Sequence, residues 1–118
     1  TAAVYCTKSI VLETASTSLD VRLTSNVRST SSVKMYYRII GSEDDTTIDK
    51  INWIPFNTNG EEDITVTPAE DNSSFREYKY SVNNLKDFTT FQLKIGMTGS
   101  ISSYPPKIRD MRAIALAI

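Results

Sequence analysis

The stretch FQLKIGMT at residues 91–98 decides the fold class. Phe91, Leu93, Ile95 and Met97 alternate with polar or small residues. In a β-strand this spacing puts all four apolar side chains on one face of the sheet, whereas a helix would distribute them over opposite sides. The segment therefore predicts a half-buried strand.

The same alternation with a period of two recurs along most of the chain, and no window of eleven residues carries the apolar stripe of a helix. The further segments are residues 5–12, 19–24, 33–40, 51–54, 64–67, 77–82 and 108–118. Pro55 and Pro68 end two of these runs, because proline cannot donate to a sheet ladder. This spacing predicts an all-β protein, an antiparallel β-sandwich of about eight strands that is jelly-roll-like.

Several side chains are assigned to the interior by this pattern. The segment at residues 57–60, Asn-Thr-Asn-Gly, is expected to form the turn of a hairpin connection, since these residues tolerate positive φ. Trp53 is expected in the core, and the lone Cys6 is expected to be a small buried hydrophobe. The strand residues expected to be buried are Leu19, Val21, Leu23, Phe91, Leu93 and Ile95.

The overall composition fits one globular domain covering residues 1–118. The chain contains 13 Lys and Arg against 14 Asp and Glu, a net charge of −1, so neither nucleic acid nor an anionic membrane is an expected partner. Its longest apolar run is far below the roughly 20 residues of a membrane span. The chain starts at Thr1 and stops within an apolar alternation, so we expect a module excised from a longer chain.

The chemistry-bearing residue types are few. The chain has no His and one Cys, which excludes imidazole base catalysis, Ser–His and Cys–His nucleophile pairs, and most zinc sites. We therefore expect no enzyme activity, no catalytic residue and no cofactor.

Two acidic clusters adjoin predicted turns, at residues 43–45 and 61–63. A helix-loop-helix calcium site does not fit, because alignment on Gly60 puts Pro55 at the first ligand position and Val66 at the last. Solvated loops are the favoured interpretation, and no metal site is expected. Weak calcium binding in a loop remains the alternative, and its candidate ligands are Asp44, Asp45, Glu61, Glu62 and Asp63.

A possible contact surface is indicated by the alternation at residues 33–40. Tyr36 shares a face with Lys34, Arg38 and Ile40, opposite the aliphatic set, so it is a candidate for exposure. This face either packs beneath a loop or a neighbouring domain, or it binds a ligand.

Two segments carry a resemblance to a known family: FTTFQLKI at residues 88–95, and PPKIRDMRAIAL at residues 105–116. The part from about residue 75 onward resembles a module near the C-terminal ends of virion structural proteins of large contractile-tailed bacteriophages and cyanophages. The segments at residues 3–8, 18–23 and 33–38 look like earlier strands of the same module.

The resemblance implies a non-enzymatic tail or baseplate part, made in the host cytoplasm and assembled into the virion. Its partners would be other virion subunits, with self-association a further option, and the mechanism would be burial of surface. The candidate contact residues are Tyr36, Arg38, Lys94, Arg109 and Arg112. The alternative is a carbohydrate-binding module for cell-surface glycans. An exposed aromatic patch at Tyr36 or Tyr104 beside a groove would favour sugar binding, and an uncovered edge strand would favour assembly.

Overall fold

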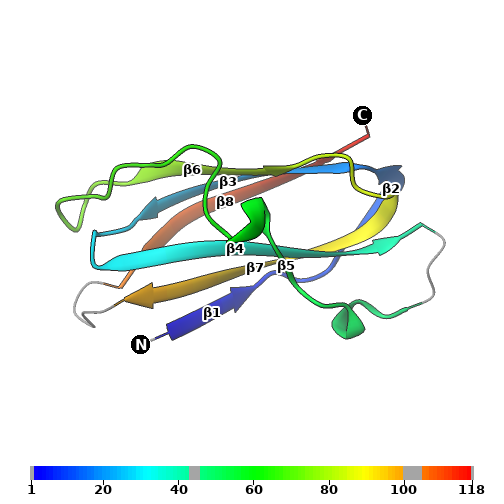
Figure 1. Ribbon diagram of the computed structural model, residues 1–118, viewed down its shortest axis with the longest axis horizontal. Coiled ribbons are helices and arrows are strands. Elements are labelled where there is room, and N and C mark those ends of the chain that lie inside the picture. Colours follow the sequence, from blue (N-terminus) through cyan, green and yellow to red (C-terminus); the bar gives the residue numbers. More distant parts are fainter. Residues whose placement is uncertain (1, 43–45, 100–104, 118) are drawn as a thin grey trace.

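The chain forms two antiparallel β-sheets packed face to face (Figure 1). The computed structural model describes residues 2–42, 46–99 and 105–117. The five-stranded sheet contains β1 (Ala2–Cys6), β2 (Ile10–Ser16), β4 (Ser31–Gly41), β5 (Ile54–Pro55) and β7 (Phe88–Gly99). The three-stranded sheet contains β3 (Ser18–Asn26), β6 (Arg76–Val82) and β8 (Lys107–Leu116).

The pairing order explains which strands are central. The five-stranded sheet runs β1-β7-β4-β5, with β2 also pairing β7, and the three-stranded sheet runs β6-β3-β8. The helical content in the described ranges is two short 3-10 turns, η1 (Ile48–Lys50) and η2 (Phe56–Thr58). The predicted all-β sandwich is confirmed. None of the helical turns described is long or apolar enough to span a membrane.

The core lies between the inward faces of the two sheets. All six strand residues expected to be buried are at most 2% exposed. Tyr37, Phe56 and Tyr80 join them, and the Phe56 ring contacts the other two edge to face, with ring centroids 4.9 Å and 6.0 Å apart. The alternation of apolar and polar residues predicted these buried positions because one face of each strand contacts the core and the other contacts solvent.

The predicted N-terminal strand is wrong in its extent. Residues 5–12 do not form one strand, because the chain breaks at Thr7. The Thr7 backbone N–H donates to the Leu93 carbonyl (2.9 Å) and its Oγ1 accepts from the Leu93 N–H (3.1 Å), so Thr7 turns the chain while keeping both bonds. Cys6, expected to be buried, is exposed. It ends β1 at the outer edge of its sheet, and β1 has no strand of the three-stranded sheet packed closely over it.

The predicted strand at residues 64–67 is also wrong, and the one at 51–54 is reduced to β5. Ile64 is 80% exposed, so no apolar face drives pairing there. Side chains fix this loop instead: the Asp63 carboxylate accepts hydrogen bonds from Ser81, and the Glu62 carboxylate accepts from the Val66 N–H. The turn expected at residues 57–60 is present, but the predicted hairpin connection is wrong, because no strand follows it at residues 64–67. Its Gly60 has a φ of 86°, and an added Cβ would lie 2.9 Å from the Lys34 Cβ.

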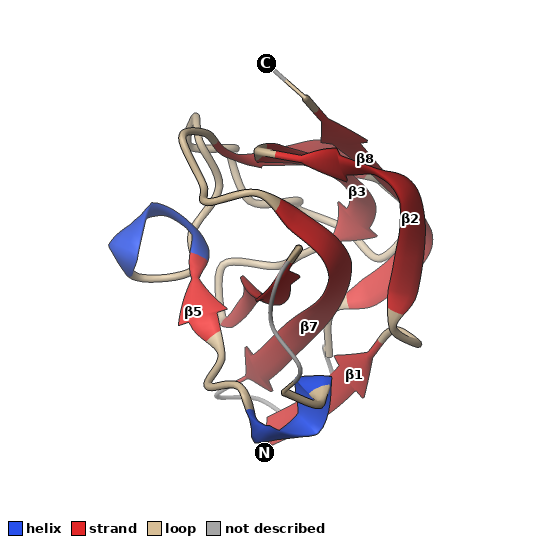
Figure 2. Ribbon diagram, turned by 90° about the vertical axis from the view of Figure 1, so that its right-hand side faces the viewer, coloured by secondary structure: helices blue, strands red, loops and turns tan. Residues whose placement is uncertain are grey.

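The two long sides of the sandwich differ (Figure 2). On one side β5 and η2 bring Phe56 between the sheets and close the core. The other side is bordered by β1, β2 and β8. Of the nine large apolar side chains that are exposed in the described ranges, these three strands carry seven. They are Val4, Tyr5, Ile10, Val11, Ile108, Ile114 and Leu116.

Candidate functional site

Three of the five predicted contact residues meet on the outer face of the five-stranded sheet. Tyr36 and Arg38 are two residues apart on β4, so they share a face. The antiparallel register between β4 and β7 sets Tyr36 opposite Lys94 and Arg38 opposite Gln92. Strand pairing therefore brings Lys94 beside Tyr36 although the two lie far apart in the sequence.

Trp53 completes this group, contrary to its expected place in the core. It is only partly buried, in the segment that follows η1 and precedes β5. The Arg38 guanidinium carbon lies 4.1 Å from the centroid of the Trp53 ring. The Lys94 ammonium lies 4.6 Å from the Tyr36 ring centroid and 5.0 Å from that of Trp53. Tyr36, Arg38, Trp53 and Lys94 are called the cation–aromatic cluster below.

The cluster is held in place by hydrogen bonds that fix Arg38. Its Nε donates to Gln92 Oε1 (2.8 Å), and its Nη1 donates to the Ile51 carbonyl (3.2 Å). Gln92 in turn donates through Nε2 to the Thr7 carbonyl (2.7 Å). A guanidinium fixed in this way over an indole ring loses little conformational freedom when a partner binds to it.

The cluster carries two positive charges, on Arg38 and Lys94. In the described parts of the chain, no carboxylate forms an ion pair with Arg38 or Lys94, whereas Arg22 and Arg112 each bind carboxylates. Lys34, which is exposed, lies two residues before Tyr36 on the same face of β4. This face can therefore accept carboxylates from outside while its aromatic rings supply apolar contact area.

The other two predicted contact residues lie on β8, in the other sheet. The Arg109 guanidinium carbon lies 4.0 Å from the centroid of the Phe75 ring. Arg112 is exposed, and it lies 3.8 Å from Glu77 and 3.6 Å from Asp110, measured between nitrogen and oxygen. The five predicted contact residues thus form two separate surfaces.

Of the candidate calcium ligands, Glu61, Glu62 and Asp63 lie in the described part of the chain, and these three are not grouped closely enough to hold a metal ion. Asp44 and Asp45 lie outside the described residues. Asp63 is occupied by internal donors, because it accepts from the Ser81 Oγ (2.6 Å) and N–H (3.0 Å) and from Asn57 Nδ2 (2.8 Å). Partial burial favours a higher pKa for Asp63, but these hydrogen bonds and the charge of Lys79 outweigh it and lower the pKa.

Within residues 2–42, 46–99 and 105–117, no three His, Cys, Asp or Glu side chains are grouped closely enough to hold a metal ion. Tyr104, the second aromatic residue considered for sugar binding, lies outside those ranges. No protein-family model, curated protein sequence or solved structure matches this chain.

Proposed function

We propose that this domain is a non-enzymatic structural module of a contractile-tailed phage virion, which holds its place in the tail or baseplate by protein–protein contacts through the cation–aromatic cluster. The observation that carries the contact mechanism is the stacking of Arg38 on Trp53 beside Lys94 and Tyr36. The virion setting rests on the resemblance of residues 88–95 and 105–116 to virion structural proteins.

The residue types of the cluster favour a protein partner. Trp, Tyr and Arg are the side chains most enriched among those that dominate the binding energy of protein interfaces. Arg38 and Lys94 form no ion pair with a carboxylate of the described residues, which favours an acidic patch on that partner, since charge-assisted hydrogen bonds to carboxylates are stronger than neutral ones. Three members of the cluster, Tyr36, Arg38 and Lys94, lie on neighbouring strands of a sheet, and this geometry suits a broad contact.

The carbohydrate-binding alternative has less support from the geometry. A sugar ring stacks on the open face of an aromatic side chain. Here Arg38 lies over Trp53, and Lys94 lies over Tyr36, so a sugar would have to displace a cation from those ring faces. The uncovered apolar edge formed by β1, β2 and β8 is the feature expected of a module that assembles with other proteins.

The test uses particles of a phage that encodes this chain. Mass spectrometry of purified particles should detect its peptides, and a photo-crosslinking residue at position 36 should link it to another virion protein. The variant Arg38→Ala/Lys94→Ala should weaken incorporation. Its matched control is Lys79→Ala, which removes an exposed cation from the other sheet and should leave incorporation unchanged.

The outcomes separate the two candidate functions. Absence of the chain from purified particles would refute the virion assignment. Binding to a glycan array that is lost in Trp53→Ala, with no crosslink to a virion protein, would favour the carbohydrate alternative.

A further inference from the structure

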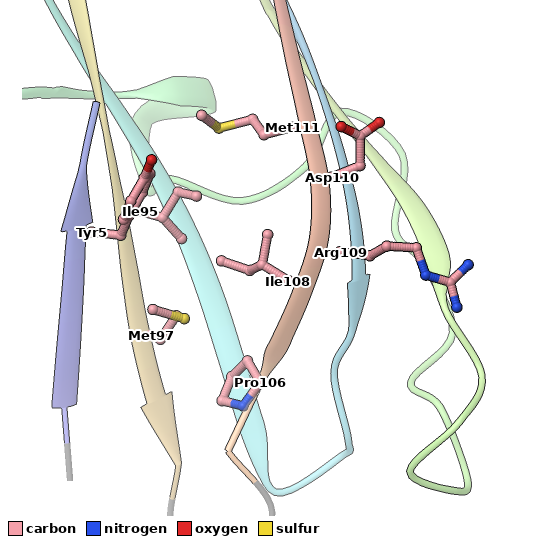
Figure 3. Close-up of a pocket in the computed structure, with 8 residues that line it drawn as sticks. All are labelled: Tyr5, Ile95, Met97, Pro106, Ile108, Arg109, Asp110 and Met111. Atoms are coloured by element: carbon pink, nitrogen blue, oxygen red, sulfur yellow. The ribbon is translucent and has the colours of Figure 1, made fainter. Parts of the chain in front are cut away.

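The long side of the sandwich that is bordered by β1, β2 and β8 contains a groove between the two sheets. The groove has a volume of about 550 Å³ and lies between β7 and β1 on one wall and β8 on the other. Its apolar lining includes Tyr5, Ile95, Met97 and Ile108. Figure 3 shows Ile95 of β7 and Ile108 of β8 directed toward the space between the sheets, whereas the Asp110 side chain points away from it.

One wall of this groove is β8, an edge strand of the three-stranded sheet. In the described parts of the chain β8, Lys107–Leu116, pairs with β3 alone, and nine of its ten residues have a partner there because the register shifts at Arg109. On the side away from β3, every second residue of such a strand presents its N–H and C=O without a strand partner. Ile114 and Leu116 on this strand are 57% and 43% exposed. An exposed apolar edge of this length is a template for pairing with another strand.

The charges on β8 identify which strand fits. Asp110 and Arg112 are two residues apart, so they lie on the same outward face with Met111 between them. We propose that β8 pairs antiparallel with β8 of a second copy of this chain, about a twofold axis at Met111. In that register Asp110 of each copy faces Arg112 of the other, which gives two reciprocal ion pairs.

The present partners of Arg112 leave it free to make these contacts. Its nitrogens lie 3.6 Å from Asp110 and 3.8 Å from Glu77, and its side chain is 68% exposed. Arg22, by comparison, binds Asp20 and Glu77 at 3.1 Å each. Shifting Arg112 onto the Asp110 of a second copy replaces two long contacts with an ion pair between the copies and leaves the Arg22 pairs intact.

The same arrangement covers the apolar groove. Antiparallel pairing about a twofold axis joins the two three-stranded sheets into one sheet of six strands. The axis is perpendicular to that sheet, so both five-stranded sheets lie on its same side with their β1 edges toward each other. The groove residues Tyr5 and Ile108 of the two copies then face a shared interior, which removes exposed apolar area.

The test is a charge swap read by association. Sedimentation equilibrium from about 1 to 200 µM should show a monomer–dimer equilibrium for the unaltered chain. Asp110→Arg and Arg112→Asp each put like charges opposite one another twice, and each should weaken the dimer by about tenfold or more. The double variant Asp110→Arg/Arg112→Asp restores both pairs and should dimerise like the unaltered chain.

Two controls separate association from folding. Lys79→Glu changes an exposed charge on β6, the opposite edge of the same sheet, and should leave the dimer unchanged. Circular dichroism should be the same for all variants. Amide hydrogen exchange of residues 108–114 should slow as concentration rises, because backbone pairing protects these amides.

A chain that stays monomeric throughout this concentration range would overturn the proposal. A dimer that the single charge reversals leave intact, or that the double variant does not restore, would also refute this pairing. None of these results bears on the cation–aromatic cluster, which lies on the other sheet and is tested by crosslinking from position 36.

Discussion

Replacement of Phe56 by alanine tests whether a loop residue closes one side of the sandwich. Phe56 is fully buried and lies edge to face with Tyr37 and Tyr80. Truncation of a buried Phe costs about 3–5 kcal/mol, and loss of two aromatic contacts favours the upper half of that range. We expect Phe56→Ala to lower the free energy of unfolding by about 4 kcal/mol, a large share of the 5–15 kcal/mol typical of a domain.

The assay is urea unfolding followed by circular dichroism, with a melting curve as a second measure. A loss of 4 kcal/mol corresponds to a drop in Tm of about 15 °C for a chain of this length. Ile64→Ala is the control, because Ile64 lies in the same loop region and is mostly exposed, and it should change stability by less than about 0.5 kcal/mol. If Phe56→Ala does not fold, Phe56→Leu should still fold with a loss of about 1 kcal/mol. A loss below about 1 kcal/mol for Phe56→Ala would refute the closing role.

Four further measurements test the core, the loop and the absence of a metal. Leu93→Ala should cost about 2–5 kcal/mol in urea unfolding, since Leu93 is fully buried in the central strand β7. Tyr80→Phe should keep or raise stability by up to about 1 kcal/mol, because the buried Tyr80 hydroxyl has no hydrogen-bond partner among the described residues. The lowered pKa of Asp63 means that its contribution is complete above the ordinary pKa of 3.8 and is lost as pH falls through the lower folded value. Asp63→Asn should therefore lose about 1 kcal/mol at pH 7 and show a weaker loss of stability on acidification. Melting curves in millimolar calcium and in chelator should superimpose, and a shift of several degrees that Asp63→Asn abolishes would refute the no-metal prediction.

The sequence was sufficient for the strands that have one face in the core. At residues 19–24 and 91–95 every second side chain is buried, so the alternation reports the fold directly. It failed between residues 51 and 67, where short alternating runs predicted strands but side-chain hydrogen bonds such as Ser81 to Asp63 fix the backbone instead. Phe56 enters the core from this stretch, and a core residue outside a periodic segment leaves no pattern to read.

The candidate site was predictable only in part, for a related reason. The shared face of Tyr36 and Arg38 follows from their spacing on one strand. The position of Lys94 beside Tyr36 depends on the β4–β7 register. A period of two shows which face of the sheet a residue lies on, but it does not show which residue of the neighbouring strand lies opposite. Trp53 was assigned to the core because large aromatic residues are mostly buried. In the structure the Arg38 guanidinium stacks on the Trp53 ring, and this cation–π contact stabilises the ring at the surface.

The place of β8 beside β3 has a consequence for the time course of folding. The three-stranded sheet sets Ser18 opposite Leu116, a separation of 98 residues, so its central strand gains its second neighbour only when the chain through β8 is present. During synthesis one edge of β3 therefore stays unpaired until β8 has left the ribosome. Closure of so long a loop is slow, and refolding from urea should take milliseconds to seconds, as for other sandwiches whose contacts are distant in sequence.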